Sequence, residues 1–560
     1  MENENKLPRD KAPGYSDASR SEKFDSPPNT AVVLRDAVCT RTDEARGVLA
    51  GNKKVRVRFP PSPTGLAHIA TARMALFNYL FAKQNDGVIV MRMEDTDKER
   101  SKKEFADDIL DGLKWLGLQW DEGPIYQSER GAIYRKYLQK LFDEDKAYYC
   151  FCSQEDLEAE KQYQMSRSEA PIYSGKCAGL DKAQAEDMIK QGRRAVIRFR
   201  APRKKIKFND LVRGDIEFDT ALIGDFVIAK NLDAALYNFI VVVDDYEMGI
   251  THILRGEDHI SNTPKQILVQ EALGLPRPEY AHLPIIMGTD RSKLSKRHGA
   301  VGVTEYRRQG YLPEAVINFT AFLGWNPGTD KEIYSMEELL RDFSVERIQK
   351  GGAIFNSVRL DYLNGYYINQ RSARDLTQLC LPYFIEAGFL NEENVDGQKV
   401  YHNKQTGEGV DMKFIEKIVA YQQARLKKLS EIAPLSNYFF SGKFDYEKEL
   451  LKWKDASAEN IGLALDELVN LLSKIEVGEW GREKLETVVL PAIAAFNLTI
   501  GKTEKDRGYL LWPMRVSLCG QKMSVGPFEM ADVLGKEKTL RRLQAARDIL
   551  NGTQCSNTLW

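Results

Sequence analysis

The chain has no long apolar run and no excess of either charge sign. Nowhere in its 560 residues does a stretch approach the roughly 20 consecutive apolar side chains of a membrane-spanning helix, so we expect no membrane association. The formal net charge is −1 at pH 7, and any contact with a nucleic acid must therefore come from local clusters of Lys and Arg. One such cluster lies at residues 193–207, and an ordinary solvated face is the alternative interpretation for it.

The first residues also lack the signals that direct a protein out of the cytoplasm. Residues 1–52 contain no apolar core of the kind that a secretory signal needs. Acidic side chains are spread through them, whereas an organellar transit peptide is poor in acids. The segment is polar and has no sustained hydrophobic periodicity, so we expect a disordered extension of a cytoplasmic protein.

The 7 cysteines do not suggest disulfide bonds, because nothing in the chain indicates secretion. Cys150, Cys152 and Cys177 are grouped, and reduced thiols are one interpretation of them. The other is zinc, because thiolates one residue apart and a third on a later turn can converge on this ion, which takes four ligands and prefers sulfur.

One segment that indicates chemistry lies between two predicted strands. Val55–Phe59 alternates as a strand does, the prolines and glycine after it force a turn, and helical spacing of apolar residues follows from Ala72. A second strand is expected from Val88. Such a unit predicts parallel strands with a right-handed crossover and a ligand at the carboxyl ends of the strands. The helix N-terminus near Thr71 and the imidazole of His68 would then form a natural phosphate site.

A cationic loop follows much later in the chain, at Arg291–Arg297. It contains Lys293, Ser295 and Lys296. Lysine side chains on a flexible loop can close over a triphosphate and neutralise the charge that builds on a leaving pyrophosphate. A solvated basic loop is the alternative, and most such runs are of that kind.

Together, Pro61–Thr71 and Arg291–Arg297 resemble the two signature motifs of class I aminoacyl-tRNA synthetases, usually written HIGH and KMSKS. The surrounding residues are similar to the bacterial-type glutamyl-tRNA synthetase family, over about residues 53–550. One position departs from the pattern of the family: Ala70 stands where the first motif normally has glycine. Its methyl group would either crowd the nucleotide or merely shift it, and we interpret the change as tolerated. Thr71 in place of the second histidine is a variation that the family commonly shows.

The amino acid that such an enzyme activates can be argued from charge. An acidic substrate needs arginine for its side-chain carboxylate, because the guanidinium fork pairs with a carboxylate in two places, and an acid for its ammonium group. Arg58, Arg255 and Glu94 follow or end predicted strands and offer these groups. Glutamine is neutral and would leave a desolvated guanidinium unpaired, at a cost of roughly several kcal/mol. Surface ion pairs of little energetic value are the alternative for each of these residues.

The resemblance implies a role for each candidate residue. The catalytic positions would be His68, Thr71, Lys293, Ser295 and Lys296. Glutamate would be bound by Arg58, Ser62, Glu94, Tyr237 and Arg255, with Arg58, Arg255 and Tyr237 on its γ-carboxylate. ATP would be bound by His68, Glu257, Asp258 and Lys296. A structural zinc ion would be held by Cys150, Cys152, Tyr173 and Cys177.

The implied fold is α/β: a class I synthetase Rossmann-like catalytic domain with an inserted acceptor-stem domain, followed by an all-α anticodon-binding region. The boundaries that we expect are a disordered polar extension at 1–52, the catalytic domain at 53–135 and 236–299, the insertion with the zinc at 136–235, a stem-contact region at 300–372, and the helical region at 373–560.

The implied activity is that of a glutamate–tRNA ligase. The glutamate carboxylate attacks the α-phosphate of Mg²⁺-ATP, and the terminal adenosine hydroxyl of tRNA(Glu) then attacks the activated carbonyl. Charging of tRNA(Gln) as well, by a non-discriminating enzyme, remains open. So does a non-catalytic tRNA-binding paralogue, for which Ala70 would be the first lesion, whereas a glutaminyl-tRNA synthetase should lack the surroundings of Arg255 and should end in β-barrels. We expect a monomer.

Overall fold

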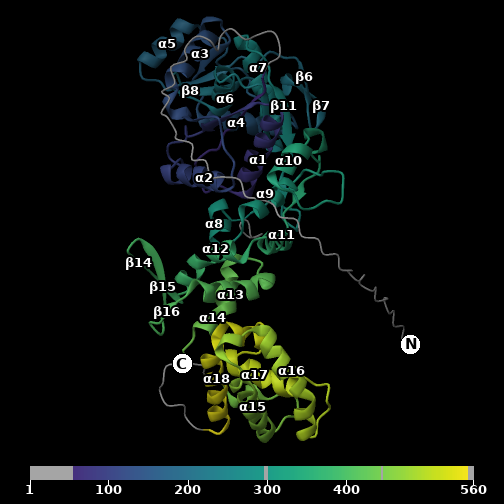
Figure 1. The fold of residues 1–560 in the computed structure, drawn as a ribbon. Coiled ribbons are helices and arrows are strands. Elements are labelled where there is room, and N and C mark those ends of the chain that lie inside the picture. Colours follow the sequence, from purple (N-terminus) through teal and green to yellow (C-terminus); the bar gives the residue numbers. More distant parts are fainter. Residues whose placement is uncertain (1–53, 296–300, 443–445, 553–560) are drawn as a thin grey trace, which may run out of the picture. The chain divides into compact units, whose positions relative to one another are not determined.

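The computed structural model describes residues 54–295, 301–442 and 446–552 (Figure 1). The expectations for the extension at 1–52 and for Lys296 fall outside these ranges. Within them, no helix combines the length and the hydrophobicity that crossing a bilayer requires.

The N-terminal half is built on parallel strands. Three of them form one sheet, in the order β1 (Arg56–Phe59), β2 (Val88–Met93) and β3 (Glu122–Tyr126). The predicted parallel pairing of the first two is confirmed, with Arg58 opposite Val90. The helix between them, α1 (Ile69–Gln84), begins two residues before the expected Thr71, because His68 serves as its extended N-cap residue. Helix α2 (Lys103–Trp115) follows β2.

A second sheet adjoins the first at β1. Its strands run in the order β10 (His252–Gly256), β11 (Glu279–Leu283), β6 (Lys205–Asp210) and β7 (Gly214–Asp219). The amide of Thr251 donates to the carbonyl oxygen of Arg56 at 2.9 Å, which aligns β10 with β1. Helix α6 (Tyr237–Glu247) precedes β10, and α7 (Thr263–Leu273) connects it to β11.

The expected insertion at 136–235 contributes strands to two different sheets. Its own sheet has the order β4 (Ala147–Cys150), β5 (Val196–Phe199), β8 (Phe226–Asn231) and β9 (Ala234–Ala235), with helices α3 (Gly131–Asp143), α4 (Gln154–Ser166) and α5 (Lys182–Lys190) around it. The hairpin of β6 and β7 instead extends the second sheet, where Asp210 pairs with Tyr280 of β11. The inserted residues therefore form part of the sheet that contains β10 and β11.

Short helices follow the cationic loop. These are α8 (Val303–Arg308), α9 (Pro313–Ala321), α10 (Met336–Asp342) and α11 (Ser357–Asn369). Most of their buried side chains belong to the core cluster that also contains β1 and α1. Ala315 of α9 and Ile368 of α11 belong instead to the core of the C-terminal half.

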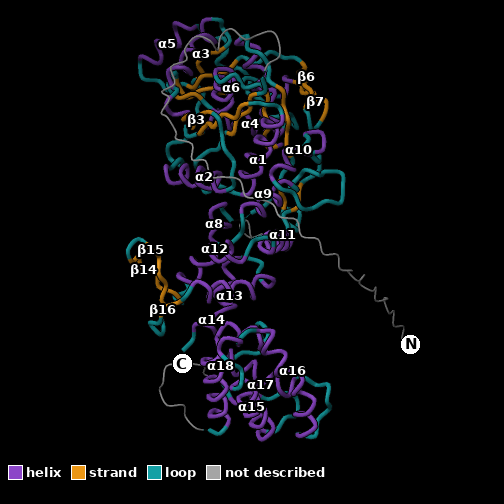
Figure 2. The backbone as a smooth tube through the Cα atoms, in the orientation of Figure 1, coloured by secondary structure: helices purple, strands orange, loops and turns teal. Residues whose placement is uncertain are grey.

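The C-terminal half is mainly helical, as expected (Figure 2). Its α-helices are α12 (Ala373–Glu386), α13 (Met412–Gln422), α14 (Ile432–Phe440), α15 (Ala458–Ser473), α16 (Arg482–Thr499), α17 (Gly508–Cys519) and α18 (Pro527–Leu550). A small antiparallel sheet departs from the all-α expectation, in the order β14 (Leu390–Val395), β15 (Gln398–Asn403) and β16 (Gly409–Val410). Asp396 and Gly397, both at positive φ, form the two-residue turn that pairs Val395 with Gln398.

Candidate active site

A cavity of about 910 Å³ opens where β1, β2 and β10 end. Its walls bring together residues from most of the predicted sets: Arg58, Ser62, His68, Thr71, Glu94, Tyr237, Arg255, Asp258, Lys293 and Ser295. The further lining residues include Arg73, Asn262 and Pro284, which the sequence did not indicate. The expected position of a ligand at the carboxyl ends of parallel strands is therefore where the cavity lies.

The loop after β1 is held at the edge of this cavity by backbone contacts. His68 forms an isolated antiparallel bridge with Gly302, and the amide of Val303 donates to the carbonyl oxygen of Ala67 at 2.7 Å. The exposed side chains of His68 and Ala70 line the cavity. The first N–H groups of α1, which lack acceptors within a helix, start at this position. The loop thus presents an imidazole and a helix N-terminus to a ligand.

The cationic segment begins with a tight turn. Lys293 pairs with Met287 in an antiparallel bridge, and the amide of Leu294 donates to the carbonyl oxygen of Ile286 at 3.0 Å. The turn between them contains Arg291 at a φ of 61°. These contacts fix the start of the segment so that Lys293 and Ser295 line the same cavity as the His68 loop.

Two arginines and two carboxylates form a buried cluster beneath the cavity. Arg92 donates from Nη1 to Asp245 at 2.6 Å and from Nη2 to Glu94 at 3.2 Å, and Arg58 donates from Nε to Asp245 at 3.3 Å. Burial raises the pKa of Glu94, against the opposing charge of Arg92. Burial would also raise the pKa of Asp245, but the charges of Arg92 and Arg58 hold that pKa below its ordinary value.

Arg255 is held differently. Its side chain is buried at the end of β10 and donates from Nε to Nε2 of His282 at 3.1 Å, from Nη1 to Oε1 of Gln266 at 2.7 Å and from Nη2 to Oγ1 of Thr263 at 2.8 Å. The hydroxyl of Tyr237 lies 3.1 Å from Nδ1 of His259. Tyr237 and Arg255 therefore reach the cavity as parts of a hydrogen-bonded wall.

The two acidic residues after β10 diverge. Asp258 lines the cavity. Glu257 is not among the described lining residues: it accepts from the backbone amide of Ile285 at 2.7 Å and forms an ion pair with Arg213. This geometry ties Glu257 to the loop that precedes the cationic segment.

The grouped cysteines converge away from the cavity, at the end of β4. The sulfur atoms of Cys150, Cys152 and Cys177 lie within 4.8 Å of one another. The Tyr173 hydroxyl lies 3.4 Å from the sulfur of Cys150 and 3.5 Å from that of Cys152. Arg198 stacks on the Tyr173 ring, with its guanidinium carbon 3.8 Å from the ring centroid. Three sulfur atoms and one phenol oxygen, from two separate segments of the sequence, thus lie close together.

Two family models match the chain. Residues 54–362 match the catalytic domain of class I tRNA synthetases (E and Q), and residues 375–547 match an anticodon binding domain. Among curated proteins, the chain is 41% identical over 499 residues to glutamate–tRNA ligase 2 of Thermoanaerobacter pseudethanolicus, covering 89% of this chain and 98% of that protein. It is 43% identical over 500 residues to glutamate–tRNA ligase 1 of Caldanaerobacter subterraneus, covering 88% of this chain and 97% of the relative.

The fold has solved counterparts as well. A crystal structure of a glutamate tRNA ligase from Elizabethkingia meningosepticum, in complex with its amino acid, superposes with a TM-score of 0.75 at 29% identity. The match covers 89% of this chain and 99% of that one. On the catalytic match, the curated relatives and the cavity that unites both motifs, the chain belongs to the class I tRNA synthetases of the glutamate and glutamine family.

Proposed function

We propose that the protein is a glutamate–tRNA ligase, which activates L-glutamate with ATP and transfers it to tRNA(Glu). One observation carries the proposal: a single cavity is lined both by the charged residues Arg58, Glu94 and Arg255 and by His68 and Lys293. The curated relatives that this chain matches over nearly their whole length are all named glutamate–tRNA ligases, which supports glutamate as the amino acid.

Glutamate is bound by charge at both ends. Arg58 and Arg255 receive its γ-carboxylate, because buried guanidinium groups pair strongly with a carboxylate. Glu94 and Ser62 receive the α-ammonium end, and the ion pair of Glu94 with Arg92 fixes the orientation of its carboxylate. Tyr237 adds a phenolic hydrogen bond. The bound glutamate then directs its α-carboxylate toward the His68 loop.

ATP lies along that loop. The N-terminus of α1 and the imidazole of His68 stabilise its phosphates, and Asp258 binds its nucleoside end. Lys293 and Ser295, together with Lys296 outside the described residues, stabilise the pyrophosphate as it leaves. Mg²⁺ supplies further charge neutralisation when ATP is bound. The protein positions two reactants and needs no side-chain nucleophile, since the glutamate carboxylate is itself the nucleophile.

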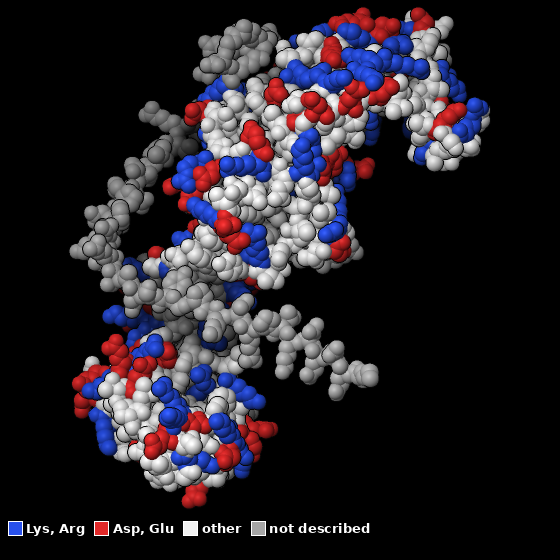
Figure 3. All heavy atoms as spheres, turned by 90° about the vertical axis from the view of Figure 1, so that its right-hand side faces the viewer, with Lys and Arg blue, Asp and Glu red and all other residues white. Residues whose placement is uncertain are grey.

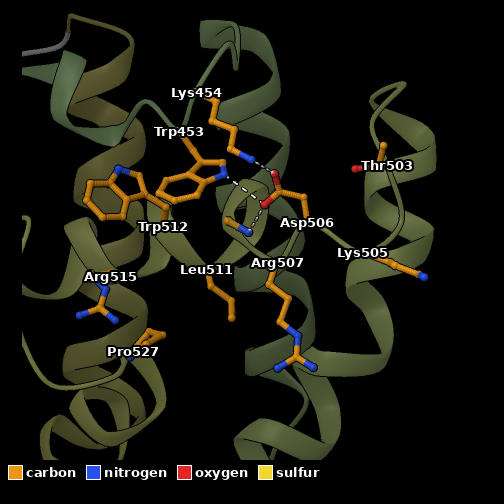
Figure 4. A pocket seen from close by; sticks show the side chains of 11 residues that line it. Trp453, Lys454, Thr503, Lys505, Asp506, Arg507, Leu511, Trp512, Arg515 and Pro527 are labelled. Carbon is orange, nitrogen blue, oxygen red and sulfur yellow. Dashed lines mark hydrogen bonds and ion pairs between the residues drawn. The ribbon is translucent and has the colours of Figure 1, made fainter. Parts of the chain in front are cut away.

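The tRNA binds the C-terminal half as well as the catalytic half. A second cavity, of about 650 Å³, is lined there by Trp453 and Trp512, whose ring centroids lie 5.3 Å apart, and by several cationic side chains (Figure 4). Aromatic faces beside positive charge suit the stacking of unpaired RNA bases. The match of this region to an anticodon binding domain supports the same partner.

The basic cluster at 193–207 is less suited to RNA than its sequence suggests. Lys205 and Lys207 both pair with Glu217, at 2.8 Å each, and Lys204 pairs with Glu271. Figure 3 shows acidic and basic side chains interspersed over the visible face. If the insertion at 136–235 binds the acceptor end of tRNA, its contacts therefore depend on the shape and the backbone groups of the insertion as well as on its net charge.

The cysteine cluster would hold a structural zinc ion. Cys150, Cys152 and Cys177 provide three sulfur donors of the type that zinc takes, and the convergence of these sulfurs supports a common metal ion. The hydroxyl of Tyr173 lies beside them and would be the fourth ligand. The ion would tie β4 to the segment after α4 and so stabilise the insertion.

Charging of tRNA tests the function. Purified transcripts of tRNA(Glu) and tRNA(Gln) are incubated with the protein, labelled glutamate, ATP and Mg²⁺, and the labelled tRNA is measured. We expect charging of tRNA(Glu); charging of tRNA(Gln) as well would identify a non-discriminating enzyme. Failure to charge either, by protein that still binds tRNA, would overturn the proposal in favour of a non-catalytic paralogue.

A further inference from the structure

The three groups that hold Arg255 are all uncharged. Gln266 and Thr263 belong to α7 and contribute an amide oxygen and a hydroxyl oxygen. His282 belongs to β11 and contributes the nitrogen Nε2. All three are at most 1% exposed, and they lie behind Arg255, which itself lines the cavity. The guanidinium is thus fixed from the protein side by neutral acceptors alone.

His282 can serve as a neutral acceptor because of Asp210. The Oδ2 atom of Asp210 lies 2.6 Å from Nδ1 of His282, which places the ring proton there and leaves Nε2 free to accept. Burial lowers the pKa of His282, against the attraction of Asp210, and the charges of Arg255 and Arg213 lower it further. Arg255 therefore faces an imidazole and not an imidazolium.

The amide of Gln266 is oriented by a second partner. Its Nε2 donates to Oδ1 of Asn238 in α6 at 3.1 Å, which turns its oxygen toward Arg255. Asn238 in turn contacts Asn262, and Asn262 contacts His259 at 3.3 Å. Neutral side chains thus continue along this wall of the cavity as far as Tyr237.

The other buried arginines of the site are in a different electrostatic position. Arg58 and Arg92 share Asp245, and Arg92 also pairs with Glu94 and, at 4.0 Å, with Asp244, so each of these two arginines has at least one carboxylate partner. Within the described part of the chain, no carboxylate forms an ion pair with Arg255. A buried cation that no carboxylate contacts directly is costly, and a ligand carboxylate in contact with it would relieve that cost.

We propose that Gln266 is a positioning residue for substrate specificity: it orients Arg255 without neutralising it, and so reserves that charge for the side-chain carboxylate of the amino acid. Thr263 and His282 complete this neutral support. The proposal rests on the proposed function, because it concerns the choice of glutamate over glutamine. It predicts that specificity depends on the charge of a residue behind the cavity.

The test is the isosteric substitution Gln266→Glu. A carboxylate at 266 would form an internal ion pair with Arg255, so a substrate carboxylate would gain less from binding, whereas a neutral carboxamide would lose less. Charging of tRNA is measured with glutamate and with glutamine as substrates. We expect KM for glutamate to rise about ten- to a hundredfold, with a smaller change in kcat, and the preference for glutamate over glutamine to shrink by a similar factor.

Two further variants separate charge from structure. Gln266→Met removes the same hydrogen bond but adds no charge. The loss of orientation should weaken glutamate binding, while Arg255 stays unneutralised and most of the preference for glutamate is retained. Gln270→Glu introduces the same carboxylate one turn later in α7, where Gln270 is also buried but contacts the hydroxyl of Tyr280 instead. It should leave the preference unchanged, and thermal unfolding of each variant reports any general loss of stability.

The outcomes distinguish this inference from the function on which it rests. If the unmodified protein does not charge tRNA with glutamate, the proposed function fails. If it does, but Gln266→Glu keeps the full preference for glutamate, the inference about Gln266 is wrong. An equal loss of preference in Gln266→Met and Gln266→Glu would also overturn it, because the hydrogen bond and not the neutral charge would then be decisive.

Discussion

Asp245 joins Arg92 to Arg58: a single carboxylate oxygen accepts from Nη1 of Arg92 at 2.6 Å and from Nε of Arg58 at 3.3 Å. Because Arg92 also holds Glu94, the carboxylate of Asp245 connects the two ends of the proposed glutamate site. Asp245→Asn should leave two buried cations undercompensated and lower the free energy of unfolding by about 3–5 kcal/mol. Urea unfolding measures this change. A variant as stable as the parent would show that the cluster does not depend on this charge.

The pKa of Glu94 predicts how glutamate binding depends on pH. Burial raises this pKa, so Glu94 takes up a proton at a higher pH than an ordinary carboxyl group. As the pH falls through the raised pKa, the ammonium group of glutamate loses its counter-charge and KM for glutamate should rise. Steady-state charging across the acidic range measures KM. In Glu94→Gln, KM should be high at every pH, and an unchanged pH profile in that variant would assign the titration to another group.

Ala70 predicts a variant with improved nucleotide binding. Its side chain is exposed and lines the cavity within the first turn of α1, so Ala70→Gly removes a methyl group from the wall. KM for ATP should fall, while helix propensity costs about 0.5–1 kcal/mol of stability. KM for ATP and a thermal melt together check this. An unchanged KM with lower stability would mean that the methyl group does not touch ATP.

Lys293 should act on the rate and not on amino-acid binding. Lys293→Ala is expected to lower kcat by about 10²-fold, because a charge that stabilises the leaving pyrophosphate is lost. KM for glutamate should change little, since the proposed contacts of glutamate are made by Arg58, Glu94 and Arg255 and not by Lys293. Lys296→Ala, outside the described residues, should behave in the same way. Equal losses in kcat and in glutamate affinity would contradict both assignments.

The proposed zinc site predicts a stability effect confined to the cysteine cluster. Metal analysis of the purified protein should find about one zinc ion per chain. Cys177→Ser should release zinc and lower the melting temperature, whereas Cys380→Ser, at an isolated buried cysteine, should leave the zinc content unchanged. Zinc retained in full by Cys177→Ser would exclude this ligand set.

The sequence predicted those parts of the site that lie within short motifs. Arg58, His68, Glu94 and Lys293 stand beside strand ends or turns whose residue types are locally recognisable, and the structure brings them to one cavity. The hairpin at Asp396 was missed although its Asp-Gly pair is a turn signal, because the flanking residues are too polar to suggest strands.

The supporting residues could not be predicted in the same way. Asp245 lies 187 residues from Arg58, and Asp210 lies 72 residues from His282. No local pattern marks such partners, since Asp245 lies on helix α6 and Asp210 on strand β6, and only the tertiary fold brings them to Arg58 and His282. The one available signal was the presence of charged residues within otherwise apolar segments, as at Arg92 in β2, because a buried charge requires a partner.

Arg73 donates from α1 to the carbonyl oxygens of Leu323 and Pro284, and the helices after the cationic loop share their buried side chains between two cores. Val316 and Ala315 are neighbours in α9, yet they pack into different halves of the protein. This region therefore contributes to the hydrophobic cores of both halves. Truncating the chain on either side of this region would produce fragments with exposed apolar surfaces. The part that activates the amino acid and the part that binds RNA are therefore expected to remain joined in one chain and to unfold together.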